Sequence, residues 1–327
     1  MLKRHLNPLI VALALIVTLP LSFAQSAAPS WPTKPIKLLV PYAAGGPADV
    51  VARELALVLS ADLKQAVTVE NQGGGMGVPA LGVVARAEPD GHTLLLAAFG
   101  NMVLQPMLSK KGGADLVAKL KPVSTISTGP HVLVVSAKLP VKNIPELIDY
   151  ARANPGKVSF ASAGTGGTAH LGMEMFKALS KTDVIHVPYK GSAGAVNDLI
   201  SGEVSAMFSS LPSLQGLADK GLVKVLAATA PSKSNATKSL PLIGAALPGF
   251  DYTTWYAMYA PLATPKPVVD AINLALTKAL KTPALVAKIE AAGTELQAGS
   301  PEEVQAWTQR DTEKWSRVIR DAKIAIE

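Results

Sequence analysis

The sequence predicts an α/β protein built as two similar lobes. Short apolar segments alternate with amphipathic segments of helical length, which is the pattern of strands covered by helices. An order of strand, glycine-rich loop and helix occurs twice, once from Ile36 and again from Val158. About 300 residues remain once an N-terminal leader is set aside. Because single hydrophobic cores stop growing near ~250–300 residues, two lobes are expected.

The first lobe opens in the N-terminal third of the chain. Its strands are short apolar runs, and Gly- and Pro-rich loops separate them from the helices. Asp90-Gly91 marks a turn before the last of these strands. The expected elements, in order, are a strand at 36–40, a helix at 49–63, a strand at 67–70, a helix at 79–87 and a strand at 93–98.

The second lobe repeats this order, although its sequence is not a repeat of the first. A strand ends in the glycine-rich loop 162–168, and a helix follows that loop. The expected elements are a strand at 158–161, a helix at 170–179, a strand at 184–187, a helix at 195–200 and a strand at 204–208.

The last part of the chain is mainly helical. An aromatic strand at 252–260 precedes helices at 267–280, 283–291 and 301–322, and each helix opens at a proline, which favours the first helical turn. Such a layer packs on one lobe or braces both. We expect the chain to cross between lobes near 127–132 and to return near 250–252. The predicted domains are therefore a signal peptide at 1–24, lobe 1 at 31–129 and 252–327, and lobe 2 at 130–251.

The N-terminus has the order of a secretory signal. Lys3 and Arg4 precede an apolar run from Leu9 to Leu19, and Ser22-Phe23-Ala24 offers a cleavage site after Ala24. The run is shorter than the roughly 20 apolar residues that span a bilayer, and no later segment is long enough. We therefore expect an exported, soluble, periplasmic protein.

Composition narrows the classes of function. The chain contains no cysteine, which excludes a lipid-anchored cysteine, disulfides and thiol catalysis. Without Lys3 and Arg4 the basic count falls from 31 to 29 against 24 acidic residues, so the mature net charge is +5. That charge suits an anionic ligand, although it also serves solubility alone. Basic residues are scattered, which argues against nucleic acid.

Four loops follow expected strands and precede expected helices, at 41–49, 71–78, 162–170 and 188–194. Ligands of open α/β sheets bind beyond the C-terminal ends of strands, where helix N-termini present free N–H groups to anions. Glycine lets the backbone approach a ligand closely. Ordinary turns are the alternative for any single loop, but four in matched positions favour an anion clamp.

Motifs of catalysis or cofactor binding are weak or absent. Gly164, Gly166 and Ala169 fit G-x-G-x-x-A after a strand, but the match is short and an exported protein has little access to nicotinamide cofactors. The sequence has no G-x-S-x-G, no phosphate-loop motif and no H-E-x-x-H. The histidines lack metal-ligand spacing, so His170 and His186 are expected to be structural. We expect Asp49 to cap the N-terminus or carry charge in the first helical turn, and to orient the loop before it. No cofactor, metal or enzymatic activity is predicted.

A series of short motifs extends over nearly all of the mature chain. In chain order they are Trp31-Pro32-Thr33-Lys34-Pro35-Ile36, Val40-Pro41-Tyr42-Ala43-Ala44-Gly45-Gly46-Pro47-Ala48-Asp49, Ala52-Arg53, Val69-Glu70-Asn71, Pro89-Asp90-Gly91-His92-Thr93-Leu94-Leu95, His186-Val187-Pro188-Tyr189-Lys190-Gly191, Asp198-Leu199-x-x-Gly202, Trp255, Ala260-Pro261 and Thr264-Pro265-Lys266. Each motif alone is modest, but together they are specific. In this order and spacing the chain resembles the Bug (TctC-like) solute-binding proteins.

The resemblance implies a fold like that of type II periplasmic binding proteins, with two α/β lobes around a ligand cleft. It implies capture of a small organic carboxylate, either a di- or tricarboxylate or an aromatic acid, for the membrane subunits of a tripartite tricarboxylate-type transporter. We expect a monomer. Alternatives are a sensor that presents its ligand to a membrane receptor, which shares the same site, and an exported hydrolase, for which the sequence shows no nucleophile beside a base.

Site residues carried over by position form three groups. Two loops are expected to hold a carboxylate from opposite lobes, mainly through backbone amides and hydroxyls, and a third group meets the distal end of the ligand. The first loop is Tyr42, Ala43, Ala44, Gly45 and Gly46; the second is Ser162, Gly164, Thr165, Gly166, Gly167 and Thr168; the third group is Gly191, Ser192, Ala193 and Ser209.

This sequence departs from the family at two informative positions. Gly167 stands where many members have Ser or Thr, so Thr165 or Thr168 must supply the hydroxyl, and the extra room favours a bulkier acid. Ser209 stands where some members carry an acidic residue suited to an amino group, which argues against an amino-acid ligand.

Overall fold

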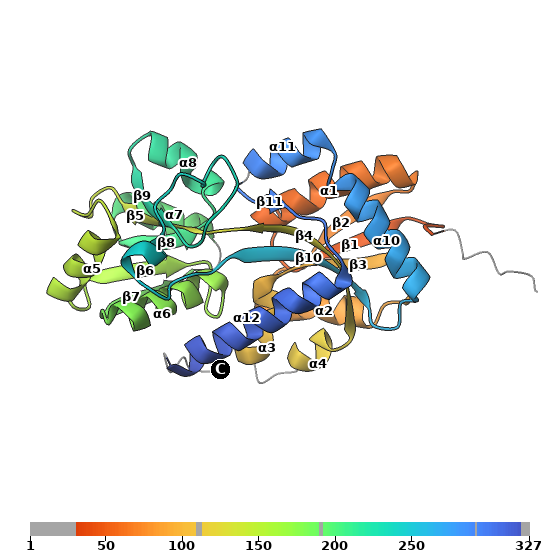
Figure 1. Cartoon of the computed structure of the whole chain (residues 1–327), viewed down its shortest axis with the longest axis horizontal. Helices are drawn as coiled ribbons and strands as arrows, with labels where there is room; N and C mark the ends of the chain where they lie inside the picture. The colour runs from red at the N-terminus through yellow and green to blue at the C-terminus, as the bar shows by residue number, and fades with distance from the viewer. Residues whose placement is uncertain (1–30, 109–112, 190–191, 292, 322–327) are drawn as a thin grey trace, which may run out of the picture. The chain divides into compact units, whose positions relative to one another are not determined.

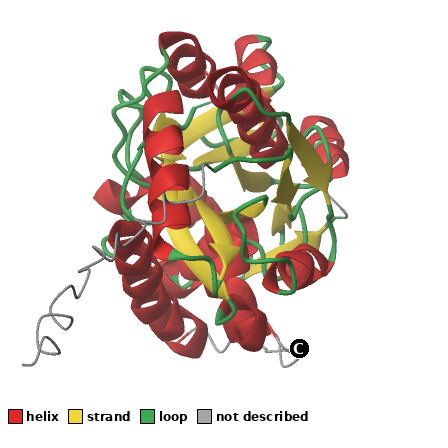
Figure 2. Cartoon of the chain, turned by 90° about the vertical axis from the view of Figure 1, so that its right-hand side faces the viewer, coloured by secondary structure: helices red, strands yellow, loops and turns green. Residues whose placement is uncertain are grey.

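The computed structural model describes residues 31–108, 113–189, 192–291 and 293–321. Within this part of the chain the strands form two separate sheets, each covered by helices (Figure 1). Figure 2 shows the strands inside and most helices outside, as the alternating sequence pattern predicts. The predicted leader and its cleavage site lie outside the described residues.

The first sheet has six strands in the order β11-β4-β10-β3-β1-β2. Strands β1, β2 and β3 are parallel, whereas β10 pairs antiparallel with both β3 and β4. The strands are β1 Ile36–Val40, β2 Val67–Asn71, β3 Thr93–Ala98, β4 Leu120–Gly129, β10 Thr254–Pro261 and β11 Glu295–Leu296.

The second sheet has five strands in the order β7-β6-β8-β5-β9. Strands β6, β7 and β8 are parallel, and β5 pairs antiparallel with β8 and β9. The strands are β5 Val132–Ser136, β6 Val158–Ser162, β7 Val184–Pro188, β8 Ala206–Ser209 and β9 Val223–Ala228.

The two sheets share one plan, which confirms the doubled order read from the sequence. In each, the first strand in chain order lies between the second and the third, as β2-β1-β3 and β7-β6-β8. In each sheet, the third strand pairs with an antiparallel strand that the chain enters after crossing from the other sheet. This strand is β10 beside β3 and β5 beside β8. Two connections therefore join the lobes, between Gly129 and Val132 and between Ala228 and Thr254.

Each predicted helix is present with ends within a few residues of those expected. Helix α1 begins at Pro47 because proline suits the first turn, so Asp49 lies within that turn and Gly46 occupies the cap position. Of the two roles expected of Asp49, the structure shows the charge in the first helical turn and not the N-cap. Lobe 1 contains α1 Pro47–Leu63, the 3₁₀ turn η1 Gly75–Gly77, α2 Val78–Ala85, the π-helical turn η2 Gly100–Leu104, α3 Gln105–Leu108 and α4 Gly113–Val117. Lobe 2 contains α5 Ile144–Ala153, α6 Thr168–Ser180, α7 Ser192–Ser201, α8 Pro212–Asp219 and α9 Ile243–Ala246. The structure thus adds α3, α4, α5, α8 and α9, which were not predicted.

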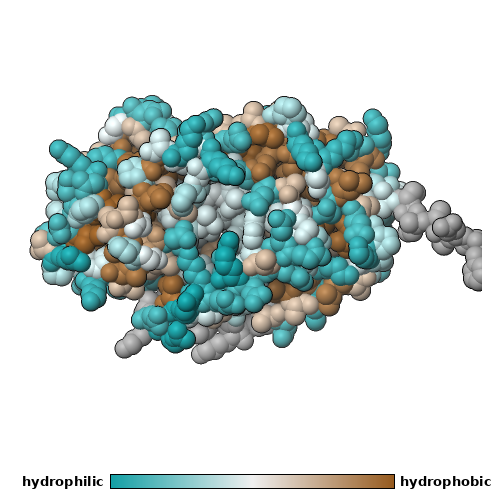
Figure 3. Space-filling view, in the orientation of Figure 1, coloured by the Kyte–Doolittle hydropathy of each residue, from teal (hydrophilic) through white to brown (hydrophobic). Residues whose placement is uncertain are grey.

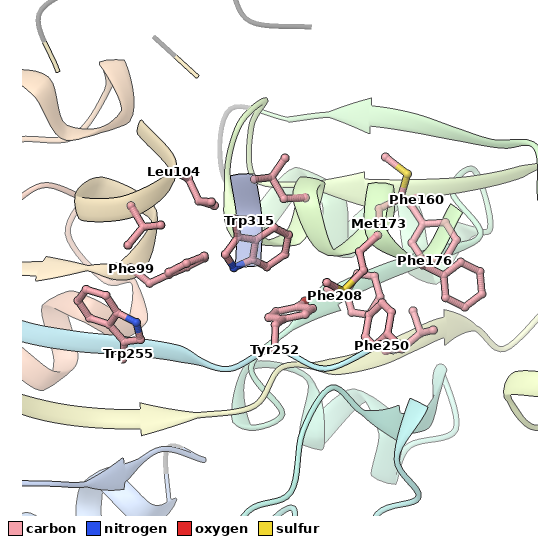
Figure 4. Packing of buried hydrophobic residues seen from close by; sticks show 14 of the residues in the cluster. Phe99, Leu104, Phe160, Met173, Phe176, Phe208, Phe250, Tyr252, Trp255 and Trp315 are labelled. Carbon is pink, nitrogen blue, oxygen red and sulfur yellow. The ribbon is translucent and has the colours of Figure 1, made fainter. Parts of the chain in front are cut away.

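The C-terminal helices are α10 Lys266–Ala279, α11 Pro283–Ala291 and α12 Pro301–Asp321. Helix α12 packs against β4 and η2 of lobe 1 and against α6 of lobe 2, so it braces elements of both lobes rather than one. Its Trp315, 1% exposed, lies between Phe99 at the end of β3 and Tyr252 in the segment that returns from the second sheet, with ring centroids 5.7 and 5.8 Å away (Figure 4). This aromatic contact ties the helix to the connection between the lobes.

The core of each lobe is aliphatic and aromatic, and hydrophilic residues dominate the surface, where hydrophobic patches are scattered on the face seen in Figure 3. None of the helices in the described ranges has the length and apolarity to cross a bilayer.

Candidate functional site

Loops from both lobes meet at Gly100, which opens η2 two residues after the end of β3. A Cβ atom built on Gly100 would lie 3.7 Å from Thr168 Oγ1 and 3.8 Å from Tyr42 Oη. Tyr42 follows β1 of lobe 1, and Thr168 is the first residue of α6 in lobe 2. Tyr42 and Gly100 come together because β1 and β3 are parallel strands that end at the same edge of the first sheet. Thr168 meets them from the second lobe, although 126 positions separate it from Tyr42 in the sequence.

The first loop is held in shape by the helix that follows it. The Gly45 amide, at φ 84°, donates to Asp49 Oδ2 over 2.8 Å, and Arg53 Nε donates to the same oxygen over 2.9 Å. Burial raises the pKa of Asp49, but the hydrogen bonds from Arg53 and Gly45 outweigh it and hold that pKa below its usual value. Asp49 is therefore an anion that orients the loop, as expected, and its charge is balanced by Arg53.

The glycine-rich loop after β2 packs directly behind the first loop. A Cβ on Gly73 would lie 2.9 Å from the Ala43 amide nitrogen, so only glycine fits there. Asn71 Nδ2 donates to the Tyr42 carbonyl over 3.2 Å. This loop therefore supports the first loop from behind, and Tyr42, Ala43, Ala44, Gly45 and Gly46 remain at the surface or half-buried.

The second loop is organised by two histidines. Ser162 Oγ lies 2.7 Å from His186 Nε2 and accepts a hydrogen bond from the Gly164 amide over 3.2 Å. The Gly166 amide donates to His170 Nδ1 over 3.0 Å, and the two imidazole rings stack with centroids 3.9 Å apart. The hydroxyl of Ser162 and the N–H of Gly166 are thus bonded within the protein, and Ser162 is 1% exposed.

Burial keeps these histidines neutral. It lowers the pKa of His170 to about 4, with the neighbouring His186 and Lys177 acting in the same direction, and it lowers the pKa of His186 as well. A neutral His170 can accept the Gly166 N–H through Nδ1, whereas an imidazolium cannot. Both histidines therefore have the structural, hydrogen-bonding role expected of them.

The Tyr42 side chain contributes a neutral hydroxyl. Burial raises its pKa far above the ordinary value, and the nearby Tyr256 acts in the same direction. The hydroxyl stays protonated at any physiological pH and remains a hydrogen-bond donor. Gly164, Gly167 and Thr165 complete the second loop, which reaches the N-terminus of α6 with Gly167 in the cap position.

The third group of expected site residues is described only in part. Gly191 lies outside the described residues, and Ser192 and Ala193 open α7, but their side chains are not described. Ser209 Oγ lies 3.0 Å from Ser213 Oγ, at the C-terminal end of β8. Tyr189, the residue after β7, donates to Asp198 Oδ2 over 2.5 Å. Burial raises the pKa of Tyr189 to about 12, and the hydrogen bond to Asp198 acts in the same direction.

Sequence reasoning missed two parts of this region. Gly100 and Asn101 follow the strand 93–98, so the rule that selected the other loops applies to them too. Met76 lies in the glycine-rich loop 71–78, and neither composition nor spacing predicts which residues its side chain contacts. Asn101 is 2% exposed; it accepts from the Ala98 amide and donates to the Met76 carbonyl, joining two loops.

The arrangement suits hydrogen bonding to an anion. It presents two protonated hydroxyls, two helix N-termini and glycines that expose their backbone. Backbone N–H groups at helix N-termini favour negative charge without a basic side chain. Among the described residues no group of three His, Cys, Asp or Glu side chains has the geometry to hold a metal ion.

The family model described as "Tripartite tricarboxylate transporter family receptor" matches residues 51–324. The chain belongs to this receptor family. It is also 32% identical to the protein BugT of Bordetella pertussis over 304 residues, covering 91% of this chain and 92% of BugT.

Solved structures of similar proteins have the same fold. An R. palustris protein with adipate is 31% identical, has a TM-score of 0.84 and covers 90% of this chain and 99% of its own. The periplasmic binding protein BugD is 32% identical, with a TM-score of 0.81 and coverage of 90% and 99%. MatC from Rhodopseudomonas palustris with bound malate is 28% identical, with a TM-score of 0.79 and coverage of 88% and 99%. The predicted periplasmic-binding-protein fold is confirmed.

Proposed function

We propose that this receptor-family protein is a solute-binding protein that captures a small organic carboxylate between its two lobes. The convergence of Tyr42, Gly100 and Thr168 from both lobes is the observation that carries the proposal. The adipate and malate in structures of similar proteins support a carboxylate as the ligand class.

One ligand carboxylate is held between the two facing loops. Lobe 1 contributes the Tyr42 hydroxyl and the exposed backbone of Ala43, Ala44, Gly45 and Gly46. Lobe 2 contributes the Thr168 hydroxyl together with Gly164, Thr165 and Gly167. In this proposal Ser162 and Gly166 act from behind, since their polar groups are already bonded to His186 and His170. Gly191, Ser192, Ala193 and Ser209 meet the distal end of the ligand.

Charge supports an anionic ligand without a direct ion pair. The mature chain carries a net charge of +5, from 29 basic and 24 acidic residues. The basic side chain beside the first loop, Arg53, is bonded to Asp49. Binding therefore relies on amides and hydroxyls, which select for the shape of the acid as well as its charge.

The membrane partners follow from the family. We propose that the mature protein acts in the periplasm after cleavage near Ala24 and delivers its ligand, as a monomer, to the membrane subunits of a tripartite tricarboxylate-type transporter. We assign residues 31–129 and 252–327 to lobe 1 and residues 130–251 to lobe 2. Presentation of the ligand to a membrane receptor is the alternative use of the same site.

The proximity of Ser162 and His186 makes hydrolysis the second candidate function. Their separation of 2.7 Å is within reach of a nucleophile and its general base. However, Ser162 is 1% exposed and its oxygen is bonded to the Gly164 amide. We therefore propose binding without turnover; appearance of hydrolysis products of a bound ester or amide would reverse this choice.

A thermal-shift screen tests the proposed function. The mature chain from Gln25 is heated with adipate, malate, citrate and benzoate, and with an uncharged sugar and an amine as controls. A ligand that binds only the folded state raises the melting temperature. At a ligand concentration of 100 times its Kd, it adds about 2.7 kcal/mol to the free energy of unfolding. We expect at least one acid, and neither control, to shift the transition. If no carboxylate does so in the screen or in calorimetry, the carboxylate assignment is wrong.

A further inference from the structure

We infer that Met76 is a cross-lobe latch, a residue that sets ligand affinity by stabilising the closed arrangement of the lobes. Its thioether reaches from the lobe 1 loop after β2 to Gly166 on the lobe 2 loop. A Cβ on Gly166 would lie 3.0 Å from both Met76 Sδ and Cε, and 3.3 Å from Leu108 Cδ1. Met76 and Leu108 of α3 therefore both pack against Gly166 and leave no room there for a side chain.

The backbone of Met76 is in a conformation that a side chain disfavours. Its φ of 52° and ψ of 27° are left-handed, and it is one of three described non-glycine residues with positive φ. Left-handed backbone costs an L-residue stability and persists where the surroundings impose it, most often at ligand clamps and switch regions. Glycine would fit this position without strain, so the methionine side chain has a use that offsets its conformational cost.

Both ends of the contact are fixed. On lobe 1, the buried Asn101 donates to the Met76 carbonyl over 2.9 Å, and Gly75 and Gly77 flank it with positive φ. On lobe 2, Gly166 has φ 78°, and its amide is bonded to His170 Nδ1. A rigid contact between two lobes is made in one arrangement of those lobes and lost when they separate.

The contact therefore contributes to closure without a bond to the ligand. A ligand shifts an equilibrium between open and closed lobes only by its preference for one of them, and any other contact present in the closed form alone adds to that bias. Each buried CH₂ contributes about 0.8 kcal/mol, which is about fourfold in the closure equilibrium. This inference rests on the proposed function only in assuming that the lobes open and close.

The first test uses the ligand-free protein. Because the chain has no cysteine, cysteines placed at the exposed positions Leu57 on α1 and Lys220 after α8 can carry spin labels without interference. The label distance is measured in wild type, Met76→Gly and Met76→Leu. We expect a closed population in wild type that Met76→Leu retains and Met76→Gly loses by about fourfold or more. Coinciding distributions for wild type and Met76→Gly, or a wild type without a closed population, would overturn the inference.

A second measurement separates the latch from a role in folding. Met76→Gly relieves the left-handed strain, so its melting temperature is expected to be no lower than that of Met76→Leu. With adipate or malate, whichever binds wild type in the screen, Met76→Gly should raise the Kd about fourfold or more while Met76→Leu leaves it within about twofold. Equal Kd values overturn the latch. Failure of every acid to bind wild type overturns the proposed function instead, and the label distances still decide the latch.

Discussion

At the scale of single residues, the site depends on groups whose protonation and position are set by burial. Tyr42 keeps its proton, and the pKa of His170 lies near 4, both because burial disfavours the charged form. Thr168 combines two functions, since it opens α6 and points its hydroxyl toward Gly100. These residues offer donors to an anion and no titrating charge at neutral pH.

Thr168→Val should weaken carboxylate binding. Valine keeps the volume of threonine but removes the hydroxyl, so a carboxylate held by that hydroxyl loses one hydrogen bond, worth roughly 1–3 kcal/mol. Calorimetry with the acid found in the screen measures the change. The control is Thr308→Val on α12, where the hydroxyl bonds to the Val304 carbonyl away from the loops. Unchanged affinity of the Thr168 variant would remove this residue from the site.

His170→Gln should reduce the loss of stability in acid. Burial places the His170 pKa at about 4, below the ordinary 6.5, so the unfolded chain binds the proton more readily. The stability that depends on neutral His170 is present above pH 6.5 and is lost as the pH falls toward 4. The groups around the ring are His186, stacked on it, and Glu174 and Lys177 on the same helix.

Denaturant unfolding between pH 7 and pH 4 measures this effect. Glutamine can still accept the Gly166 N–H but cannot be protonated, so the variant should take up about one proton fewer on unfolding than wild type. His131, whose pKa burial also lowers to about 4, retains its own contribution in both proteins. Identical pH slopes for the two proteins would contradict the assignment.

At the scale of elements, loops and helices are coupled through buried polar side chains. Helix α1 carries Asp49 in its first turn, and the carboxylate reaches back to the Gly45 amide. Helix α6 carries His170 in its first turn, and the ring reaches back to the Gly166 amide. In each lobe, a side chain in the first turn of the helix therefore holds the shape of the loop before it, Asp49 in lobe 1 and His170 in lobe 2.

Asp49→Ala should loosen the first loop. The Gly45 amide and Arg53 lose their acceptor, and the helix loses a favourable charge in its first turn, so a loss of about 1–2 kcal/mol is expected. Hydrogen exchange should show faster exchange of the Gly45 amide, and acid binding should weaken. The control is Glu54→Ala on the same helix, which removes only an exposed ion pair with Lys288. Unaltered exchange at Gly45 would exclude this coupling.

At the scale of the whole molecule, the two lobes share their connections and the last helix. Trp315 on α12 lies between Phe99 of lobe 1 and Tyr252 of the returning segment, and Trp255 Nε1 donates to the buried Asp311 of α12 over 2.7 Å. Tyr252 also packs on Gly172 of α6, where a Cβ would lie 2.6 Å from its hydroxyl. The helix therefore holds the region where the chain passes between the sheets.

Trp315→Ala should destabilise the folded protein strongly. Removing a fully buried tryptophan leaves a cavity between aromatic rings, which costs about 3–5 kcal/mol. Denaturant unfolding followed by fluorescence measures it. The control is Trp307→Ala on the same helix, where the side chain is only half-buried and, among the described rings, contacts Trp255 alone in a tilted arrangement. Equal losses for the two variants would mean that the position between the lobes has no special weight.

Local sequence by itself determined much of this protein. Strands such as 36–40 and 93–98 were predicted to the residue, because a short apolar run between turn residues has few other solutions. The doubled order of strand, loop and helix determined two lobes on one plan, and the motifs from Trp31 to Lys266 determined the family. Helix ends were less certain, since Pro47 rather than Asp49 opens α1.

Only the tertiary structure decided which residues meet. Gly100 joins Tyr42 and Thr168, and Met76 reaches across to Gly166, although about a third of the chain separates the lobes' loops. Local pattern records which face of an element is buried, but it carries no information about which distant loop lies opposite. That follows from the sheet order and from the two connections between the sheets, and these in turn depend on packing over the whole chain.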